Sequence, residues 1–493
     1  MTLRPFDRLR VAPSNVEGRQ AQGQPGQRRG LNERTARIAL AGALFVYVLG
    51  IRTYDVTTTF LMLGEQARDW TIALGSIADL PLVGAPSTAG GRGLGPAYYW
   101  LLWLGRVTIG PFMDNLPHAG GIVVALLQSI GDTWLFVALS RRVPWSLALA
   151  TCLLIASGPF DIAISSVIWN PPVATALVKM ATASALMIGP PSGATGSGRV
   201  VVTAAFAWAA VQTHLSALFV VGPLLLGVVL QPLLFERAWL FVHDTAHGMW
   251  RPALQGTGRA IGTITVVIAL LQIPFIMSIV REPDAVAGPA TAIADITSGR
   301  SFQPLRGLDI VSGVTGNIVL TMPDSFRFWI PTLIAGALVI IVYRRDPIVL
   351  GASMGGILLA TMVFATWTRG YDRYWFLPMT TSLALTFAMP LAAIPTRSAV
   401  TWGGVGLAAL VASWQPARIN LSEHFFEYPQ YEAMVRGSRE IVGRAPVVKD
   451  IKVAFEVHPT MDRHLVYTIL GGRIDPTAVH TAIINNDGSI RLE

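Results

Sequence analysis

The sequence predicts an all-α, polytopic membrane protein with about eleven membrane-spanning helices and a small C-terminal α/β domain. Of the 493 residues, 52% are hydrophobic and 13% are charged, whereas a soluble domain carries about 25% charged residues. Apolar stretches of about 17 to 25 residues recur, each long enough to cross a hydrocarbon layer of about 30 Å as a helix. Arginines gather in the N-terminal tail and at the ends of these stretches, where they act as topology signals. The net charge of +8 therefore does not indicate a nucleic-acid partner.

The chain begins with residues 1–35, a tail rich in Arg, Gly, Gln and Pro that predicts disorder. Its arginines favour a cytoplasmic location. Residues 36–414 form the predicted transmembrane domain, so we expect a multi-pass protein of the plasma (inner) membrane. The spans are expected at 36–54, 119–140, 144–160, 172–189, 198–213, 215–231, 258–280, 328–344, 347–366, 374–393 and 398–414.

The stretch 96–111 is apolar but short, so it either spans the membrane or lies in the interface. If it does not span, most arginine-rich turns fall on the same side as the basic tail, as the positive-inside bias favours. We therefore expect an interfacial helix. Its aromatic anchors would be Tyr98, Tyr99, Trp100 and Trp103.

This topology places the N-terminus in the cytoplasm and three large segments outside: 55–118, 281–327 and 415–493. We expect interfacial helices in the first segment. The second mixes Gly, Pro, Ser and Thr with scattered charges, which suits a partly mobile loop over a site. The third combines a helical stretch near 428–442 with alternating apolar runs, which predicts a small extracytoplasmic α/β domain.

Carboxylates concentrate in the first outer segment: Asp55 ends the first span, and Glu65 and Asp69 follow. Glu65 and Asp69 are four residues apart, so on a helix they share one face. Two carboxylates at the mouth of a membrane bundle suit a general base with a supporting partner. The alternative is a solvated amphipathic helix whose Arg68 and carboxylates face water.

A glycine-dense loop over residues 84–96 carries one arginine, Arg92. Such a loop allows close backbone approach to a ligand, and the guanidinium could bind a phosphate with two parallel hydrogen bonds. No Gly-Lys-Ser/Thr sequence follows, so the loop is not a Walker motif. The alternative is a bare linker.

A second basic and aromatic cluster lies between two spans at residues 367–375. Its side chains suit a lipid phosphate with its first sugar, or simply anchor the protein in the interface. The candidates are Arg369, Tyr371, Arg373 and Tyr374. His214, at a predicted outer turn, could donate a hydrogen bond to a substrate. Asn170 follows Trp169 at the start of the fourth span, as a helix cap or a pocket wall.

Asp132 and Lys179 are charges inside predicted spans, where burial is costly, so they either serve function or pair with each other. Cys152 is the one cysteine, which excludes an intrachain disulfide and a cysteine cluster. Zinc, nucleophile-elbow and dinucleotide signatures are absent from the sequence. The residues predict no metal site and no cofactor, and leave the use of a divalent cation open.

Several short motifs follow Arg52 and the acidic first outer segment in order: Gly95-Pro96-Ala-Tyr98-Tyr99-Trp100-Leu, Gln212-Thr-His214-Leu-Ser and Arg373-Tyr374-Trp-Phe-Leu-Pro378. The order of these motifs resembles the GT-C superfamily of membrane glycosyltransferases, in the branch of the protein mannosyltransferases and aminoarabinose transferases. The resemblance covers about residues 36–414 and leaves out the C-terminal domain.

This resemblance implies an inverting transferase whose donor sugar is carried on a polyprenyl phosphate. Members usually carry an Asp-Glu pair or an Asp where this chain has Glu65-Gln66, so Glu65 inherits the role of base and Asp69 and Asp55 remain rivals. Gly95-Pro96-Ala97 replaces the more usual Pro-Pro-Leu.

The leading hypothesis is transfer of a sugar from a polyprenyl-phosphate donor to a cell-envelope acceptor on the outer face. An outer site has no supply of soluble nucleotide sugars, whereas a lipid-linked sugar reaches it within the membrane. The expected substrate-binding residues are Arg92, Tyr98, Tyr99, Asn170, His214, Arg369, Tyr371, Arg373 and Tyr374. The alternatives are a flippase of lipid-linked sugars that uses Asp132 and Lys179, and a noncatalytic envelope scaffold.

Overall fold

The structure is a computed structural model. It describes residues 26–54, 56, 64–86, 92–113, 116–188, 195–240, 250–281, 302–320, 329–367, 372–394, 396–423, 451–455, 480–484 and 490–492. Residues 1–40 and 41–493 form two compact units, and the packing below concerns the second. Of the predicted disordered tail, residues 1–25 lie outside the described residues, but the prediction is wrong for residues 26–35, because helix α1 begins at Gly26.

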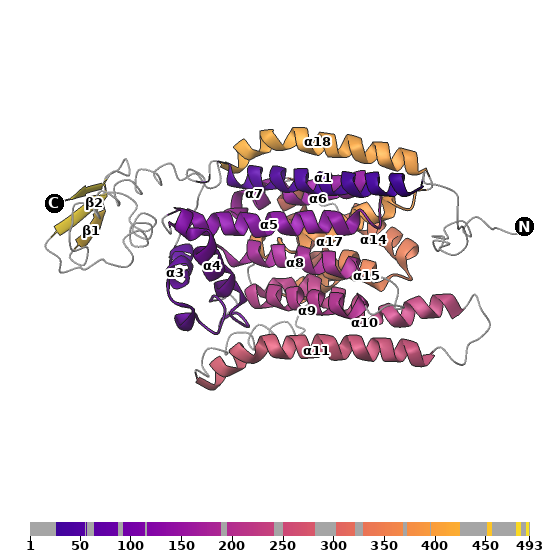
Figure 1. Ribbon diagram of the computed structural model, residues 1–493, viewed down its shortest axis with the longest axis horizontal. Coiled ribbons are helices and arrows are strands. Elements are labelled where there is room, and N and C mark those ends of the chain that lie inside the picture. Colours follow the sequence, from indigo (N-terminus) through magenta and orange to yellow (C-terminus); the bar gives the residue numbers. More distant parts are fainter. Residues whose placement is uncertain are drawn as a thin grey trace, which may run out of the picture. The chain divides into compact units, whose positions relative to one another are not determined.

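Apolar helices make up most of the described chain (Figure 1). The first half contains α1 (Gly26–Thr53), α3 (Gly64–Leu74), η1 (Ile77–Asp79), α4 (Ala97–Thr108), η2 (Gly110–Met113), α5 (Pro117–Leu139), α6 (Trp145–Ala156), α7 (Pro159–Ser165), α8 (Asn170–Leu186), α9 (Thr195–Thr213), η3 (Leu215–Ala217) and α10 (Leu218–Leu240). The second half contains α11 (Trp250–Arg281), α13 (Pro304–Leu320), α14 (Trp329–Tyr343), α15 (Pro347–Leu350), η5 (Gly351–Gly355), α16 (Gly356–Thr366), η6 (Arg373–Phe376), α17 (Met379–Leu391) and α18 (Arg397–Glu423).

Within the described residues, five helical segments are long and apolar enough to cross a membrane: 34–53, 117–139, 215–234, 253–281 and 347–366. Shorter apolar helices lie at 145–156, 329–343, 379–391 and 398–411. The protein is therefore a multi-pass helical membrane protein. Each of the eleven predicted spans overlaps a helix, but the number that cross the membrane stays a prediction.

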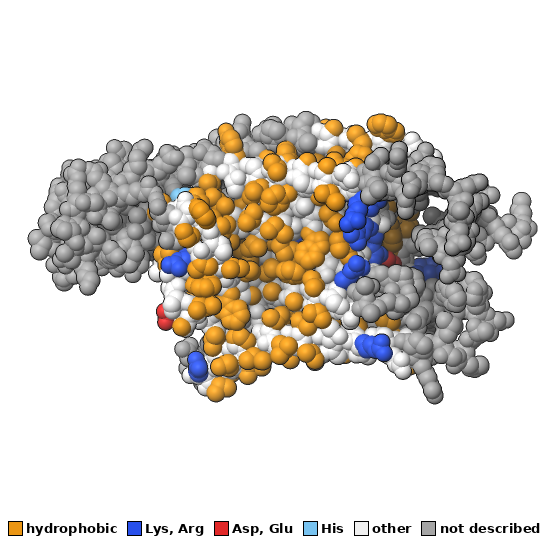
Figure 2. Space-filling view, in the orientation of Figure 1, with side chains coloured by type: hydrophobic (Ala, Val, Ile, Leu, Met, Phe, Trp, Pro, Cys, Tyr) orange, Lys and Arg blue, Asp and Glu red, His pale blue; other side chains and the backbone are white. Residues whose placement is uncertain are grey.

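The helices differ in how much of their apolar surface lies inside the bundle. In α5, 61% of the apolar window is buried, against 17% in α11. Helix α5 packs on α8, and α8 packs on α9, so these three form the centre (Figure 1). Figure 2 shows that hydrophobic side chains cover most of the described surface of one face, as expected of a surface in contact with lipid.

At one end of these central helices, arginines link neighbouring turns. Arg142 Nη1 lies 2.5 Å from Asp346 Oδ2, and Arg142 Nε donates to the Leu186 carbonyl at 2.7 Å. Arg199 donates to the Met187 carbonyl. Cations that bond to the last carbonyls of a helix also complement its dipole. The turns after α5, before α9 and before α15 therefore meet at one end of the bundle, as the arginine bias predicted.

The expectation of a mobile loop over 281–327 is wrong for part of that range, because Pro304–Leu320 is the helix α13, which packs on α16. A side-chain carbon at Gly307 would collide with the Thr361 carbonyl, so this glycine lets the two backbones approach closely. The segment was mistaken for a loop because its apolar residues are interrupted by glycine and polar residues.

The predicted helix in 96–111 exists as α4, but two of its four expected anchors are not at a surface. Tyr98 and Tyr99 are fully buried, whereas Trp100 is 43% exposed. The two tyrosines are buried within residues 55–118 instead, because α4 contacts α3.

The part of the C-terminal region that the structure describes contains three strands, β1 (Ile451–Phe455), β2 (His480–Ile484) and β3 (Ile490–Leu492). Strand β2 pairs in parallel with β1, with Val453 opposite Ala482, and antiparallel with β3. The predicted helix near 428–442 lies outside the described residues. The α/β domain therefore stays a prediction.

A cysteine at the exposed position Ile77 is expected to react with an impermeant maleimide added to intact cells, and one at Ser197 is not. The reason is that Ile77 lies in the first outer segment and Ser197 near the arginine-rich end. A Cys152→Ala background removes the native thiol. Labelling of Ser197→Cys but not Ile77→Cys would invert the assigned orientation.

Candidate functional site

A carboxylate and an indole meet at the end of the bundle opposite the arginine-rich turns. Glu65 lies in the first turn of α3 and is exposed. Its Oε2 accepts a hydrogen bond from Trp169 Nε1 at 3.1 Å. Trp169 is the residue before α8, so 104 residues of sequence separate the two partners. The contact ties the first outer segment to the central helices.

Aromatic rings continue from Trp169 across this end. The ring of Tyr374, from η6, lies 4.3 Å from the Trp169 ring, centroid to centroid. The His214 ring is 6.4 Å from the Tyr374 ring, in an edge-on arrangement. We call Glu65, Trp169, His214 and Tyr374 the mouth cluster. Four separate elements supply its members, and three of the four were candidates from sequence.

Asn170 lies beside the mouth cluster and holds two helices together. Its Nδ2 donates to the Thr213 carbonyl at 3.2 Å, which joins the start of α8 to the end of α9. The structure therefore places Asn170 as a bridge next to His214, and the side chain does not cap its own helix, because Trp169 is the N-cap residue and no side-chain capping bond is made there.

Asp69 is buried, unlike Glu65, although both lie on α3. Its Oδ1 accepts from Arg68 Nε at 2.8 Å and from the Tyr99 hydroxyl at 3.0 Å. Burial raises the pKa of Asp69, and Arg68 opposes that shift. The pKa values of Tyr98 and Tyr99 are also raised, by burial first and by the Asp69 charge second. Arg68 and Tyr99 therefore surround the carboxylate of Asp69.

The described part of the glycine loop is a packed hairpin. Gly84 N donates to the Gly93 carbonyl at 3.0 Å, and Arg92 Nε donates to the Gly84 carbonyl at 3.3 Å. A side-chain carbon at Gly95 would collide with the side chain of Gln212. This close packing against the end of α9 explains why a glycine is needed at position 95. The same packing keeps α3 and α4 near His214.

Of the remaining candidates, some lie within the described residues and others do not. Arg373 is exposed at the start of η6, one residue before Tyr374. The hydroxyl of Tyr374 donates to Asp372 Oδ2 at 2.8 Å. Asp55, Arg369 and Tyr371 lie outside the described residues, so their roles stay predictions. The residues that the structure describes contain no group of three or more His, Cys, Asp or Glu side chains able to hold a metal ion.

His214 is neutral at physiological pH. Its Nδ1 accepts from Ser216 N at 3.3 Å and lies 2.7 Å from Ser216 Oγ. Because Nδ1 is an acceptor, the proton of the neutral ring is on Nε2. Burial lowers the pKa of His214 from 6.5 to about 4. The ring can therefore offer one hydrogen-bond donor without adding a charge.

This shift predicts how stability depends on pH. Between pH 6.5 and about 4 the unfolded chain protonates His214 while the folded protein does not, so the free energy of unfolding should fall as the pH falls through this window. In His214→Gln this contribution should be lost, which melting temperatures at several pH values would reveal. An equal slope in both proteins would show that His214 is not buried as described.

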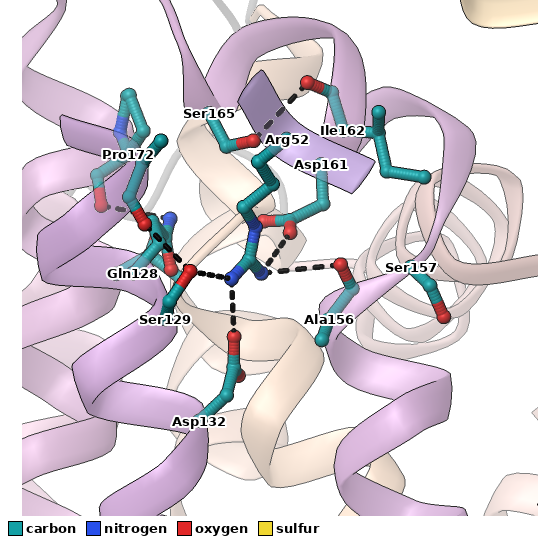
Figure 3. A network of polar contacts seen from close by, with 12 residues as sticks. Arg52, Gln128, Ser129, Asp132, Ala156, Ser157, Asp161, Ile162, Ser165 and Pro172 are labelled. Atoms are coloured by element: carbon teal, nitrogen blue, oxygen red, sulfur yellow. Dashed lines mark hydrogen bonds and ion pairs between the residues drawn. The ribbon is translucent and has the colours of Figure 1, made fainter. Parts of the chain in front are cut away.

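Four charges are paired inside the bundle, and Figure 3 shows three of them, Arg52, Asp132 and Asp161. Asp132 lies 2.7 Å from Arg52 Nη1 and 2.8 Å from Lys179 Nζ, and Arg52 Nη2 lies 2.8 Å from Asp161. We call Arg52, Asp132, Asp161 and Lys179 the buried tetrad. Its two positive and two negative charges balance, which supports the structural reading of Asp132 and Lys179 over a role in transport.

Trp169 belongs to the mouth cluster, but the sequence analysis did not select it as a site residue. The signal was the Trp-Asn-Pro-Pro sequence at the start of a span. Prolines in a first helical turn fix where the helix begins, so the residue just before them has a fixed place at the rim.

No family model matches the sequence, and no curated protein matches it. Among solved structures, ArnT from Cupriavidus metallidurans bound to undecaprenyl phosphate has 16% identity and a TM-score of 0.48, over 90% of this chain and 76% of that one. The Archaeoglobus fulgidus oligosaccharyltransferase with zinc and sulfate has 13% identity and a TM-score of 0.47, over 90% of this chain and 63% of that one. The archaeal oligosaccharyltransferase AglB with an inhibitory peptide and a dolichol phosphate has 14% identity and a TM-score of 0.44, over 90% of this chain and 64% of that one. Each of these three solved structures is no more than 16% identical to this chain, with a TM-score no higher than 0.48.

Proposed function

We propose that the protein is a membrane glycosyltransferase that moves a sugar from a polyprenyl-phosphate donor to a cell-envelope acceptor, a glycan, lipid or protein. One observation carries the proposal: an exposed carboxylate, Glu65, is held by Trp169 on an aromatic surface at one end of an apolar helix bundle. A lipid-linked sugar needs such a place, because its carrier stays in the membrane while its sugar reaches the aqueous rim.

In the proposed reaction Glu65 takes the proton of the acceptor hydroxyl as its oxygen attacks the anomeric carbon. The new bond forms on the face opposite the leaving group, so the configuration inverts. The bond between the anomeric carbon and the phosphate oxygen breaks, and the lipid phosphate leaves with the electron pair. Glu65 suits the role of base better than Asp69, because Glu65 is open to solvent and Asp69 is buried against Arg68 and Tyr99.

The surroundings of Glu65 suit a sugar phosphate. The rings of Trp169 and Tyr374 offer apolar faces on which the C–H face of a pyranose or furanose can pack. Arg373 is exposed beside Tyr374, and its planar guanidinium suits a lipid phosphate. His214 Nε2 can donate to a sugar hydroxyl. Arg92 and Arg369 remain further candidates for the phosphate.

The alternative of a flippase has no comparable support. Asp132 and Lys179 have side chains that are 0% exposed and that pair with each other, so they line no path in this state. A noncatalytic scaffold would not need a carboxylate held by an indole at the rim.

The proposal is tested in detergent with purified protein and synthetic polyprenyl-phosphate sugars, in which release of free polyprenyl phosphate is measured with and without added divalent cation. Release that depends on the protein and on a membrane-derived acceptor fraction is the expected result. If the folded protein neither releases polyprenyl phosphate nor binds it, the transferase proposal is wrong.

A further inference from the structure

A glutamine in the bundle connects the buried tetrad to the mouth cluster. Lys179 Nζ donates to Gln128 Oε1 at 2.8 Å. Gln128 Nε2 donates to the Pro172 carbonyl at 2.9 Å (Figure 3). A lysine ammonium can only donate hydrogen bonds, so it turns the amide oxygen of Gln128 toward itself. The amide nitrogen must then face the opposite way, toward α8. Lys179 thus selects the one orientation of Gln128 that can bind Pro172.

The Pro172 carbonyl belongs to the first turn of α8, two residues after Asn170. Trp169, which precedes this turn, has extended backbone angles and makes no side-chain capping hydrogen bond. Two side-chain hydrogen bonds tie this turn to neighbouring helices: Gln128 of α5 donates to the Pro172 carbonyl, and Asn170 of the turn itself donates to the Thr213 carbonyl of α9. The prolines fix where the helix begins, and these two bonds fix where that first turn lies relative to α5 and α9.

Gln128 is well placed to fix this turn because its partner Lys179 is itself held by an ion pair. Gln128, Lys179 and Asp132 are all 0% exposed, and Asp132 is also held by Arg52. A hydrogen bond between helices contributes to their association inside a membrane bundle. The buried tetrad thus gives the turn a paired, buried point of attachment.

We infer that Gln128, oriented by Lys179, is a positioning residue that sets Trp169 and through it the Glu65 carboxylate. The structural half of this inference is that Gln128 positions Trp169, and it rests on the contacts described above. The catalytic half rests on the proposed function, since Glu65 acts as base only if the protein is a transferase.

The structural half is tested with 5-fluorotryptophan-labelled protein and fluorine NMR. The Trp169 resonance is assigned by its loss in Trp169→Phe. In Gln128→Met, which lacks both polar contacts, this resonance is expected to shift or broaden. Gln128→Glu keeps the contact with Lys179 but cannot donate to Pro172, so it should give the same change and serves if Gln128→Met does not fold.

The matched control is Ser129→Ala. Ser129 neighbours Gln128 on α5 and contacts Arg52 of the tetrad at 3.3 Å, but it makes no contact with the first turn of α8 among the described hydrogen bonds. It should leave the Trp169 resonance in place. A Trp169 resonance unchanged in both folded Gln128 variants would overturn the inference, as would an equal change in Ser129→Ala.

The catalytic half is tested by measuring kcat and KM separately. Loss of the indole donor leaves the Glu65 carboxylate without the contact that positions it, so kcat should fall about tenfold or more in Trp169→Phe. Gln128→Met should also lower kcat while the KM for the donor changes little, and the double variant should lower kcat no further than Trp169→Phe alone, because both changes act through one contact. Additive losses of kcat, or an unchanged kcat in folded Gln128→Met, would refute the positioning role. If the wild-type protein has no activity, the proposed function fails while the NMR result still decides the structural half.

Discussion

Replacing Glu65 with glutamine is expected to lower turnover about 100-fold or more, while donor binding changes little. Glutamine keeps the size of the side chain and an oxygen that can accept from Trp169 Nε1, but it cannot take the proton of the acceptor hydroxyl. General base catalysis contributes about 10²–10⁴ in rate, which sets the size of the loss. The measurement is release of polyprenyl phosphate under saturating donor, with donor affinity measured separately.

Asp79→Asn is the matched control for this experiment. Asp79 is also an exposed carboxylate of the first outer segment, but its partner is Ser76, at 2.6 Å, rather than the mouth cluster. It should keep wild-type turnover. Asp69→Asn should mainly lower stability, because Asp69 is buried against Arg68 and Tyr99. If Asp69→Asn or Asp55→Asn abolished turnover while Glu65→Gln kept most of it, the assignment of the base to Glu65 would be wrong.

Removing one charge of the buried tetrad is expected to cost the largest amount of stability, about 3–5 kcal/mol for Asp132→Asn. Asp132 contacts both Lys179 and Arg52, and all three side chains are 0% exposed. Without the carboxylate, Lys179 is left as an uncompensated cation in the bundle. The free energy of unfolding can be followed by the reaction of buried Cys152 with a fluorogenic maleimide, since the thiol is shielded until the bundle opens.

The double variant Asp132→Asn/Lys179→Met distinguishes charge pairing from loss of packing. It removes both charges of one pair, so it should be less destabilised than the sum of the single variants by about 2 kcal/mol. Strict additivity would show that the two side chains do not interact, contrary to their 2.8 Å separation.

The sequence predicted the helical membrane class, because hydrocarbon thickness sets the length and composition of each span wherever it lies in the bundle. It also predicted which turns share one end, since the arginines around residues 141, 199 and 344 respond to the membrane rather than to one another. Four candidates chosen from local motifs, Glu65, Asn170, His214 and Tyr374, do gather at the other end.

Local pattern could not separate Glu65 from Asp69. The two share a helix face by spacing, yet tertiary packing leaves the first exposed and surrounds the second with Arg68 and Tyr99. Local pattern also could not predict the burial of Tyr98 and Tyr99. An aromatic residue at a membrane interface and an aromatic residue in a protein core have the same local sequence pattern. Helix α13 was missed because its apolar face is short and broken by glycine.

The sequence by itself thus determined that this chain is a helical membrane protein, which of its loops face the same side, and which short motifs carry polar and aromatic groups. Only the tertiary structure decided that Trp169 holds Glu65 across 104 residues, and that Asp132 pairs with both Lys179 and Arg52 while Arg52 also pairs with Asp161. The physical reason is that the bilayer acts on each segment separately and so leaves its mark in local composition, whereas a hydrogen bond or ion pair depends on which two helices pack together, and no local pattern records that choice.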